Sequence, residues 1–212
     1  MDYVRTTDAA TEPVTATELK NHLRIDHTDE DTMISSMISA ARRMAEEYCH
    51  RTFITSTWKA YMDDFPSYFN RAINNKENSY VRNVYEDIRL PMGRVISVTS
   101  VDYATTAAHD TPMSSSDYYV ALETEIGIIR PVTEWPDTDD EIPNGVEITY
   151  TAGYGANASD VPQDIKNAIL IIASDLYEHR ETHEQMKTRL VSYDGWKPAW
   201  QFMLDPYVIH YS

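Results

Sequence analysis

The fold is decided by residues 13–49, which read PVTATELKNHLRIDHTDEDTMISSMISAARRMAEEYC. Thr15 and Glu18 have the spacing of an N-terminal capping box, which predicts a short helix over roughly 16–24. Thr28 predicts a second cap, and the acidic residues after it suit the positive end of a helix dipole. Apolar residues then recur on one helical face, at Ile34, Met37, Ile38, Ala41, Ala45 and Tyr48. The segment therefore predicts a short helix followed by a long one.

The pattern changes to a period of two after Arg51, which is typical of half-buried strands. The most β-branched run is 95–103, and two shorter runs at 118–122 and 127–130 predict a hairpin. Further strands are predicted at 54–62, 88–90 and 146–152, with a long loop or loose hairpin at 63–86 and surface loops at 104–116 and 131–145. The middle of the chain therefore predicts a small antiparallel β unit.

A second long helix is predicted from Val161-Pro162, because proline is well tolerated in a first helical turn. Its apolar face is wide, which indicates burial against both its own domain and a neighbour. It is expected to end between His179 and Lys187. One more short helix around Trp200 is expected to stop before Pro206 and to be followed by an extended end.

These elements predict an α+β fold, in which an N-terminal helical pair and a long C-terminal helix form a helical core that carries an inserted β unit. The predicted division is an N-terminal arm at 1–13, N-terminal helices at 14–52, a β-rich insertion at 53–157, a C-terminal helix at 158–188 and a C-terminal docking segment at 189–212.

The composition argues against several classes of protein. The 212 residues carry a net charge of −16, from 34 acidic and 18 basic side chains, which is unsuited to gripping phosphates. The charge fits either plain solubility or a surface that must not adhere to DNA. Cys49 is the single cysteine, so neither a disulfide framework nor a cysteine metal site is expected within one chain. No signal peptide or membrane span is expected. We expect synthesis in a reducing cytoplasm.

Three patterns contain residue types that could form a chemical site. His179 and His183 have the spacing of two metal ligands on a helix, but the glutamate of H-E-x-x-H and a third ligand are missing. The acidic run 137–141 beside Trp135 could serve a glycosidase, but a solvated loop is the preferred interpretation. Gly153-Tyr154-Gly155 lacks the spacing of a phosphate loop and fits a strand-to-helix turn. We therefore expect no catalytic residue, no metal and no cofactor.

Four stretches, in this order, resemble the head–tail connector, or head-completion adaptor, proteins of tailed bacteriophages. They are PVT, LKNHLRI, DED, EEYC and RTF within 13–53, leading to an aromatic strand with Trp58; IRLP with VISV within 88–98; ITYTAGY, VP, IK, AI and YEHRE within 148–181; and LDPY at 204–207. The resemblance covers most of the chain, and none of its motifs is catalytic.

The resemblance implies a structural virion protein rather than an enzyme. Such a protein would be made in the host bacterial cytoplasm and would form a ring of twelve copies beneath the portal protein. The ring would extend the DNA channel, let DNA pass without specific binding, and offer a platform to the next neck or tail protein. A ring needs two different complementary patches on each copy.

Two sets of contact residues are predicted on this basis. Those of the ring interface are Met37, Ile38, Tyr48, Leu170, Ile171 and Tyr177. Those that dock on the portal are Trp200, Leu204, Pro206, Tyr207, Val208, Ile209 and Tyr211, for which packing on the chain's own domain is the alternative. A neck stopper or tail-completion protein remains an alternative function. A carbohydrate-binding module or glycosidase is a more remote one, suggested only by the Trp, Tyr and acidic content.

Overall fold

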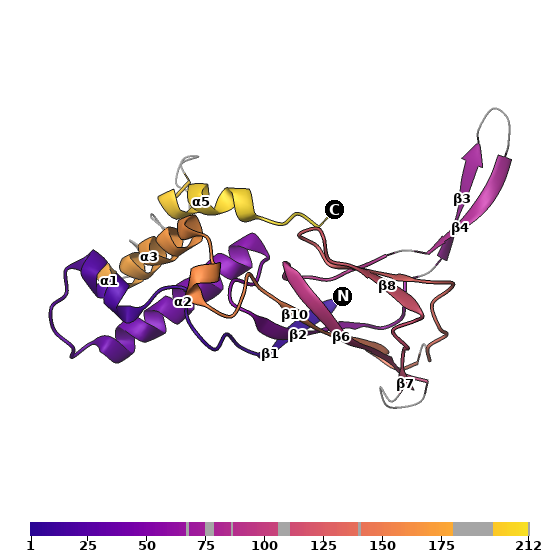
Figure 1. The fold of residues 1–212 in the computed structure, drawn as a ribbon, viewed down its shortest axis with the longest axis horizontal. Helices are drawn as coiled ribbons and strands as arrows, with labels where there is room; N and C mark the ends of the chain where they lie inside the picture. Colours follow the sequence, from indigo (N-terminus) through magenta and orange to yellow (C-terminus); the bar gives the residue numbers. More distant parts are fainter. Residues whose placement is uncertain are drawn as a thin grey trace. The chain divides into compact units, whose positions relative to one another are not determined.

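The computed structural model describes residues 1–66, 68–74, 79–85, 87–105, 111–139, 141–179 and 197–211, with the backbone alone for 68–74 and 79–85. Helices and antiparallel sheets occur together, which confirms the α+β class (Figure 1). The chain divides into two compact units. The β unit comprises Met1–Asp8 and Thr57–Ala152, and the helical unit comprises Ala9–Ser56 and Gly153–Ser212. The structure thus differs from the predicted insertion of 53–157, because Phe53, Ile54 and Tyr154 pack with the helices.

The first two helices begin and end at identifiable caps. Helix α1 (Ala16–Leu23) has the predicted capping box, in which the Thr15 N–H donates to the Glu18 carboxylate at 2.7 Å and the Glu18 N–H donates to Thr15 Oγ1 at 3.2 Å. Helix α2 (Asp31–Cys49) begins later than predicted, with Glu30 at the N-cap. The prediction that Thr28 caps α2 is wrong: its carbonyl accepts the Asp31 N–H at 3.2 Å, so a turn precedes the helix.

The core of the helical unit lies where α2 packs on α3 (Gln163–Glu178) and α3 packs on α5 (Ala199–Leu204) (Figure 1). Two short 3-10 helices, η1 (Ala158–Asp160) and η2 (Asp205–Tyr207), flank these helices. The long helices bury the periodic apolar residues, namely Ile34, Ile38, Ala41, Ala45, Ile165, Ala168, Ile169, Ile172 and Ala173. Full burial of each large aliphatic side chain stabilises the fold by about 1.5–3 kcal/mol.

Cys49 lies in this core and is fully buried. Burial raises the pKa of its thiol to about 12. A thiol that stays protonated at neutral pH is a poor nucleophile. Cys49 therefore has the packing role that its place on the amphipathic helix predicted.

Three sheets are present in the described part of the β unit. The five-stranded sheet has the order β1 (Asp2–Thr7), β2 (Ser56–Met62), β10 (Val146–Ala152), β6 (Val95–Tyr103) and β7 (Thr111–Pro112). The three-stranded sheet has the order β5 (Ile88–Arg89), β9 (Ile128–Pro131) and β8 (Tyr118–Ala121). Strands β3 (Tyr68–Asn74) and β4 (Ser79–Tyr85) pair in register as a hairpin, which is one of the two predicted alternatives for 63–86.

The core of the β unit is shared by the five-stranded and three-stranded sheets. On β10 every second residue is buried, and Ile148 pairs with Val101 of β6. The Phe65 and Trp135 rings stack at 4.7 Å between centroids and 9° between planes. The Tyr150 hydroxyl donates to the Pro91 carbonyl at 2.8 Å, so its polar atom is satisfied inside the core.

The N-terminal residues form part of the β unit, which corrects the prediction of an arm at 1–13. Strand β1 runs antiparallel to β2, with Arg5 opposite Trp58. The Arg5 guanidinium lies 4.6 Å from the centre of the Trp58 ring, a cation–π contact that fastens the strand. Most of β1 is solvent-exposed, so it lacks the apolar alternation that reveals a strand in sequence. Within the described ranges, every helix is too short or too polar to traverse a bilayer.

Candidate functional site

The C-terminal segment, residues 197–211, packs on its own helical unit. Trp200 and Leu204 belong to the core, with 7% and 0% of their surface exposed. Ile209 is 5% exposed, and its N–H donates to the Cys49 carbonyl at 3.0 Å. The predicted docking role of these three residues is therefore corrected to a packing role, because a side chain held in the core is not available to a partner.

Tyr48 and Asp205 fix the segment to the end of α2. The Tyr48 hydroxyl donates to Asp205 Oδ1 at 2.6 Å, and Lys197 Nζ donates to Asp205 Oδ2 at 2.8 Å. The Tyr48 ring meets the Trp200 ring edge-on, at 5.1 Å between centroids. Burial and the bond to Asp205 raise the pKa of Tyr48 to about 12, while Lys197 and Tyr48 lower the pKa of Asp205. The stabilisation from Asp205 is therefore lost as pH falls below the ordinary aspartate range, and that from Tyr48 is lost as pH rises toward 12.

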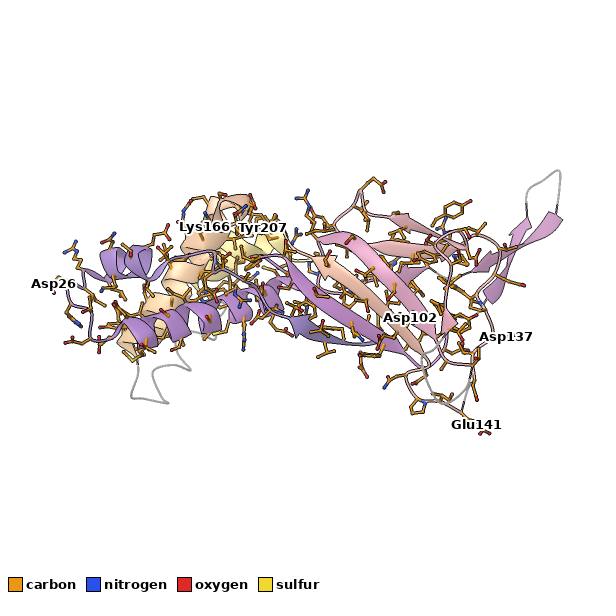
Figure 2. All side chains as sticks on the ribbon, turned by 60° about the horizontal axis from the view of Figure 1, so that its bottom comes forward. Asp26, Asp102, Asp137, Glu141, Lys166 and Tyr207 are labelled. Carbon is orange, nitrogen blue, oxygen red and sulfur yellow. The ribbon has the colours of Figure 1, made fainter. Side chains whose placement is uncertain are left out.

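Arg51 holds the rest of the segment. Its Nε donates to the Tyr207 carbonyl and its Nη1 to the Tyr154 hydroxyl, each at 3.0 Å. The Tyr207 hydroxyl donates to Asp164 Oδ2 at 3.5 Å. Tyr207 is labelled beside the helices in Figure 2. The Tyr211 hydroxyl reaches the His50 carbonyl at 3.4 Å. The segment is thus attached along its length by polar contacts as well as by its apolar side chains.

The other predicted docking residues remain at least partly accessible. Pro206 and Tyr211 are exposed, and Tyr207 and Val208 are half-buried. Phe202 on α5 is 62% exposed, although it was not among the predicted contact residues. Its position two residues from Trp200 and two from Leu204 places it on the opposite helical face, and this spacing was the signal that could have revealed it.

The predicted ring-interface residues divide in a similar way. Ile38 is 2% exposed and belongs to the core. Its predicted role in the ring interface is therefore corrected to a packing role. Met37 is half-buried, and four further residues are half-buried against their own core, namely Tyr48, Leu170, Ile171 and Tyr177. The Tyr177 hydroxyl donates to the Glu30 carboxylate. Contact with a second copy through the half-buried residues stays a prediction.

A hollow of about 380 Å³ opens beside the first half of α2. We call it the α2 hollow; it is lined by Thr11, Glu12, Val14, Thr15, Ala16, Ser35, Ile38, Asn157 and Ala158. Its walls are held by the capping box of α1 and by Glu12, which accepts from Ser39 Oγ at 2.6 Å and from Arg42 Nε at 2.7 Å. The hollow is therefore a built feature of the helical unit.

The β unit carries a second hollow, of about 890 Å³, with Trp135 in its wall. The glycosidase alternative placed Trp135 as a sugar platform, but one ring face is stacked on Phe65 and only 8% of the residue is exposed. Asp137 and Glu141, labelled in Figure 2, are exposed, as a solvated loop predicts. This hollow therefore lacks the accessible aromatic face on which the sugar-binding interpretation depended.

Gly153-Tyr154-Gly155 is a packing turn. The Tyr154 N–H donates to the Phe53 carbonyl and the Thr55 N–H to the Gly155 carbonyl, each at 2.9 Å. Gly153 has φ +143°, and a Cβ there would lie 2.6 Å from the Thr55 nitrogen. The Asp160 side chain occupies the space beside Gly155, where its charge would oppose a phosphate. The turn thus closes the backbone against residues 53–55.

We expect Gly153→Ala to lower the free energy of unfolding by about 2–4 kcal/mol, because both the φ angle and the space exclude a methyl group. Denaturant unfolding followed by circular dichroism would measure the loss. Ala156→Ser, an exposed neighbour in the same turn, is the control and should change little. An unchanged midpoint for Gly153→Ala would contradict the packing role.

The metal interpretation gains no support from the described residues. His179 Nδ1 lies 3.0 Å from the Asp175 carbonyl and 3.4 Å from the Asp175 carboxylate, whereas His183 lies outside the described residues. Within the described ranges, no group of three or more His, Cys, Asp or Glu side chains converges as metal ligands would.

Residues 14–91 match the model of the family described as "Phage gp6-like head-tail connector protein". These residues are similar to the phage head–tail connector family. The match confirms the predicted resemblance over the N-terminal helices and the first part of the β unit.

Solved structures extend this likeness to the whole chain. A chain in "Neck of empty GTA particle computed with C6 symmetry" shares the fold with a TM-score of 0.74 and 20% identity, covering 100% of this chain and 97% of that one. A chain in "Virion of native gene transfer agent (GTA) particle" gives 0.72 and 19%, with the same coverage. A chain in "Neck of native GTA particle computed with C12 symmetry" gives 0.69 and 18%, also with the same coverage. Comparison with curated protein sequences finds no match.

Proposed function

We propose that this chain is a head–tail connector protein that forms a ring of twelve copies in the neck of a tailed phage or phage-like particle. The ring lies beneath the portal protein, extends its DNA channel and offers its far side to the next neck or tail protein. The protein is synthesised in the host bacterial cytoplasm and resides in the virion. The observation that carries the proposal is the connector-family match at residues 14–91, on a fold shared over the whole chain with neck-particle proteins.

The symmetry of one similar structure supports the number of copies. That structure is the neck of a particle computed with C12 symmetry. A closed ring requires the same two patches on each copy, so each subunit must be rigid enough to repeat one geometry. The attachment of the C-terminal segment through Tyr48, Arg51 and Asp205 supplies this rigidity within the helical unit.

The charge of the chain supports free passage of DNA. The net charge is −16, and several of the few cations are already neutralised by carboxylates. Lys59 bonds Glu147 at 2.6 Å, and Arg130 bonds Asp87 through two nitrogens at 2.6 Å each. Paired cations attract phosphates weakly, so a bore lined by this protein would repel DNA from its wall.

We expect the purified protein to leave duplex DNA unshifted in a gel mobility assay at low salt, where electrostatic binding is strongest. A variant with three acidic loop residues replaced, Asp137→Lys, Asp139→Lys and Glu141→Lys, is the positive control and should retard the DNA. Retardation by the wild-type protein that disappears as salt increases would contradict the proposed non-adhesive channel.

A neck stopper or tail-completion role is the alternative within the structural class. Crosslinking of assembled particles distinguishes the two, because a portal-facing ring should join the portal protein. Crosslinks from this chain to tail proteins alone would favour the alternative.

A further inference from the structure

We propose that the β3–β4 hairpin of one copy docks in the Trp135 hollow of the next copy, so that neighbouring β units join head to tail. The Trp135 hollow is the hollow of about 890 Å³ in the β unit. Its lining includes three carboxylates and three apolar residues, namely Asp117, Glu134, Asp137, Met113, Val132 and Pro136. The inference rests on the proposed ring and names two surfaces that would join its copies.

The hairpin is a cationic element in an acidic chain. Strands β3 and β4 contain Arg71 and Arg82 but no Asp or Glu, although the whole chain has 34 acidic and 18 basic side chains. The pairing register places Arg71 directly opposite Arg82, and so on the same face of the hairpin. Like charges directly opposite each other destabilise a strand pair. A carboxylate-bearing partner at this face would therefore stabilise the hairpin as well as bind it.

Apolar residues flank the arginine pair on the same face. Phe69 pairs with Val84 on one side of it. Ile73 pairs with Tyr80 on the other side. A face that combines arginine with aromatic and aliphatic residues has the composition of a protein interface, whereas binding to nucleic acid requires several cations placed along the phosphate backbone. The register therefore favours a protein partner.

The hairpin is also a sheet of only two strands. Among the described strands, β3 and β4 pair with each other alone (Figure 1). An isolated two-stranded hairpin is only marginally stable in water, and packing against a further surface is what makes such a hairpin persist. Docking on another copy would supply that surface.

The Trp135 hollow has the complementary charge. Asp117, Glu134 and Asp137 are solvent-exposed. The Asp117 carboxylate accepts the hydroxyl of neighbouring Ser116 at 3.0 Å, but in the described part of the chain none of the three carboxylates forms an ion pair. They are therefore available to the arginines of another copy, and arginine–carboxylate hydrogen bonds are among the strongest in proteins.

The hollow is preformed and partly apolar. The Val132 N–H donates to the Asp117 carbonyl at 2.9 Å, which joins two segments of the wall. Trp135 is fixed by its stacking on Phe65 at 4.7 Å. Val132 is 45% exposed, so the hollow offers apolar surface beside its carboxylates, as the hairpin does beside its arginines. A preformed site loses little conformational freedom when it binds.

A second copy is the occupant that the proposed ring supplies. The cationic hairpin and the acidic hollow are two different, complementary surfaces that occur once in every copy. Two such surfaces on one chain produce head-to-tail contacts, and these close into a ring when the rotation between copies allows it. Opposite charges would also fix the register of neighbouring copies.

Charge reversal of the hairpin tests the contact, with assembly followed by mass photometry and electron microscopy in the presence and absence of the portal protein. Arg71→Glu combined with Arg82→Glu should raise the concentration needed for assembly by about tenfold or more, because the hairpin then meets carboxylates of its own sign. The variant still places two like charges opposite each other, so the repulsion within the hairpin is matched to that of the wild type.

Charge reversal of the hollow should have the same effect. Glu134→Lys combined with Asp137→Lys makes the hollow basic and should raise the assembly concentration to a similar extent. Asp26→Lys combined with Asp29→Lys replaces two exposed carboxylates of the helical unit and should assemble normally. Circular dichroism should show all of these variants folded.

Mixing the two defective proteins shows whether the contact joins different copies. The acidic hairpin of the first variant then meets the basic hollow of the second, and the basic hairpin of the second meets the acidic hollow of the first. Alternating rings should therefore form near the wild-type concentration. A contact within one copy cannot be restored by mixing, because each copy keeps its own two surfaces of like charge.

Normal rings from either reversed variant, or no rescue on mixing, would overturn the inference while leaving the ring itself intact. Retardation of duplex DNA by the wild type that is lost in the Arg71→Glu, Arg82→Glu protein would identify DNA as the partner of the hairpin and also overturn it. If the wild type forms no ring with or without the portal protein, the proposed function fails as well.

Discussion

Replacing Arg42 with methionine should lower the free energy of unfolding of the helical unit by about 3–5 kcal/mol. The Arg42 guanidinium is 1% exposed and donates to Glu12 at 2.7 Å and to Glu46 at 2.9 Å. Glu46 is also 1% exposed and accepts the Phe53 N–H at 2.9 Å. Removing the cation leaves a buried carboxylate beside a second carboxylate, and this uncompensated charge is the main cost.

Arg43→Met is the matched control, because Arg43 is the next residue and lies on the exposed face of α2. It should change stability by about 0.5 kcal/mol or less. Denaturant titration followed by circular dichroism measures both variants. Equal, small effects at the two positions would show that the Glu12–Arg42–Glu46 cluster does not hold the segment before α1 against α2.

The second large effect is expected for Trp200→Ala, with a loss of about 3–5 kcal/mol. The side chain is 7% exposed, packs in the helical core and meets the Tyr48 ring at 5.1 Å. Its truncation leaves a cavity that the surrounding helices can fill only in part. The same denaturant titration gives the loss.

Phe202→Ala is the control for this change, since it truncates an aromatic residue of the same helix that is 62% exposed. It should leave the free energy of unfolding nearly unchanged. If Trp200→Ala kept full stability and instead abolished portal binding, the docking role first predicted for Trp200 would be restored.

Elements with strong local signals were predictable from the sequence. The Thr15–Glu18 capping box located α1, and the apolar period located α2 and α3. Tyr150 and its neighbours on β10 were recognisable by strict alternation. In each case the determinant lies within a few residues of the element, so one window of sequence contains it.

Features that depend on distant partners could not be predicted in this way. Strand β1 is exposed and polar, and only its pairing with β2 makes it a strand. Trp200 looked like a free anchor because its partner Tyr48 is far away along the chain. The α2 hollow joins residues 11–16, 35–38 and 157–158, and no local pattern connects these stretches. Interaction surfaces are harder to predict than cores for the same reason.

Electron cryomicroscopy of the purified chain mixed with its portal protein tests the central claim most directly. The expected result is a twelve-fold ring of this chain that shares the axis of the portal and leaves an open bore. Monomers that remain separate from the portal at concentrations where portal rings are intact would contradict it.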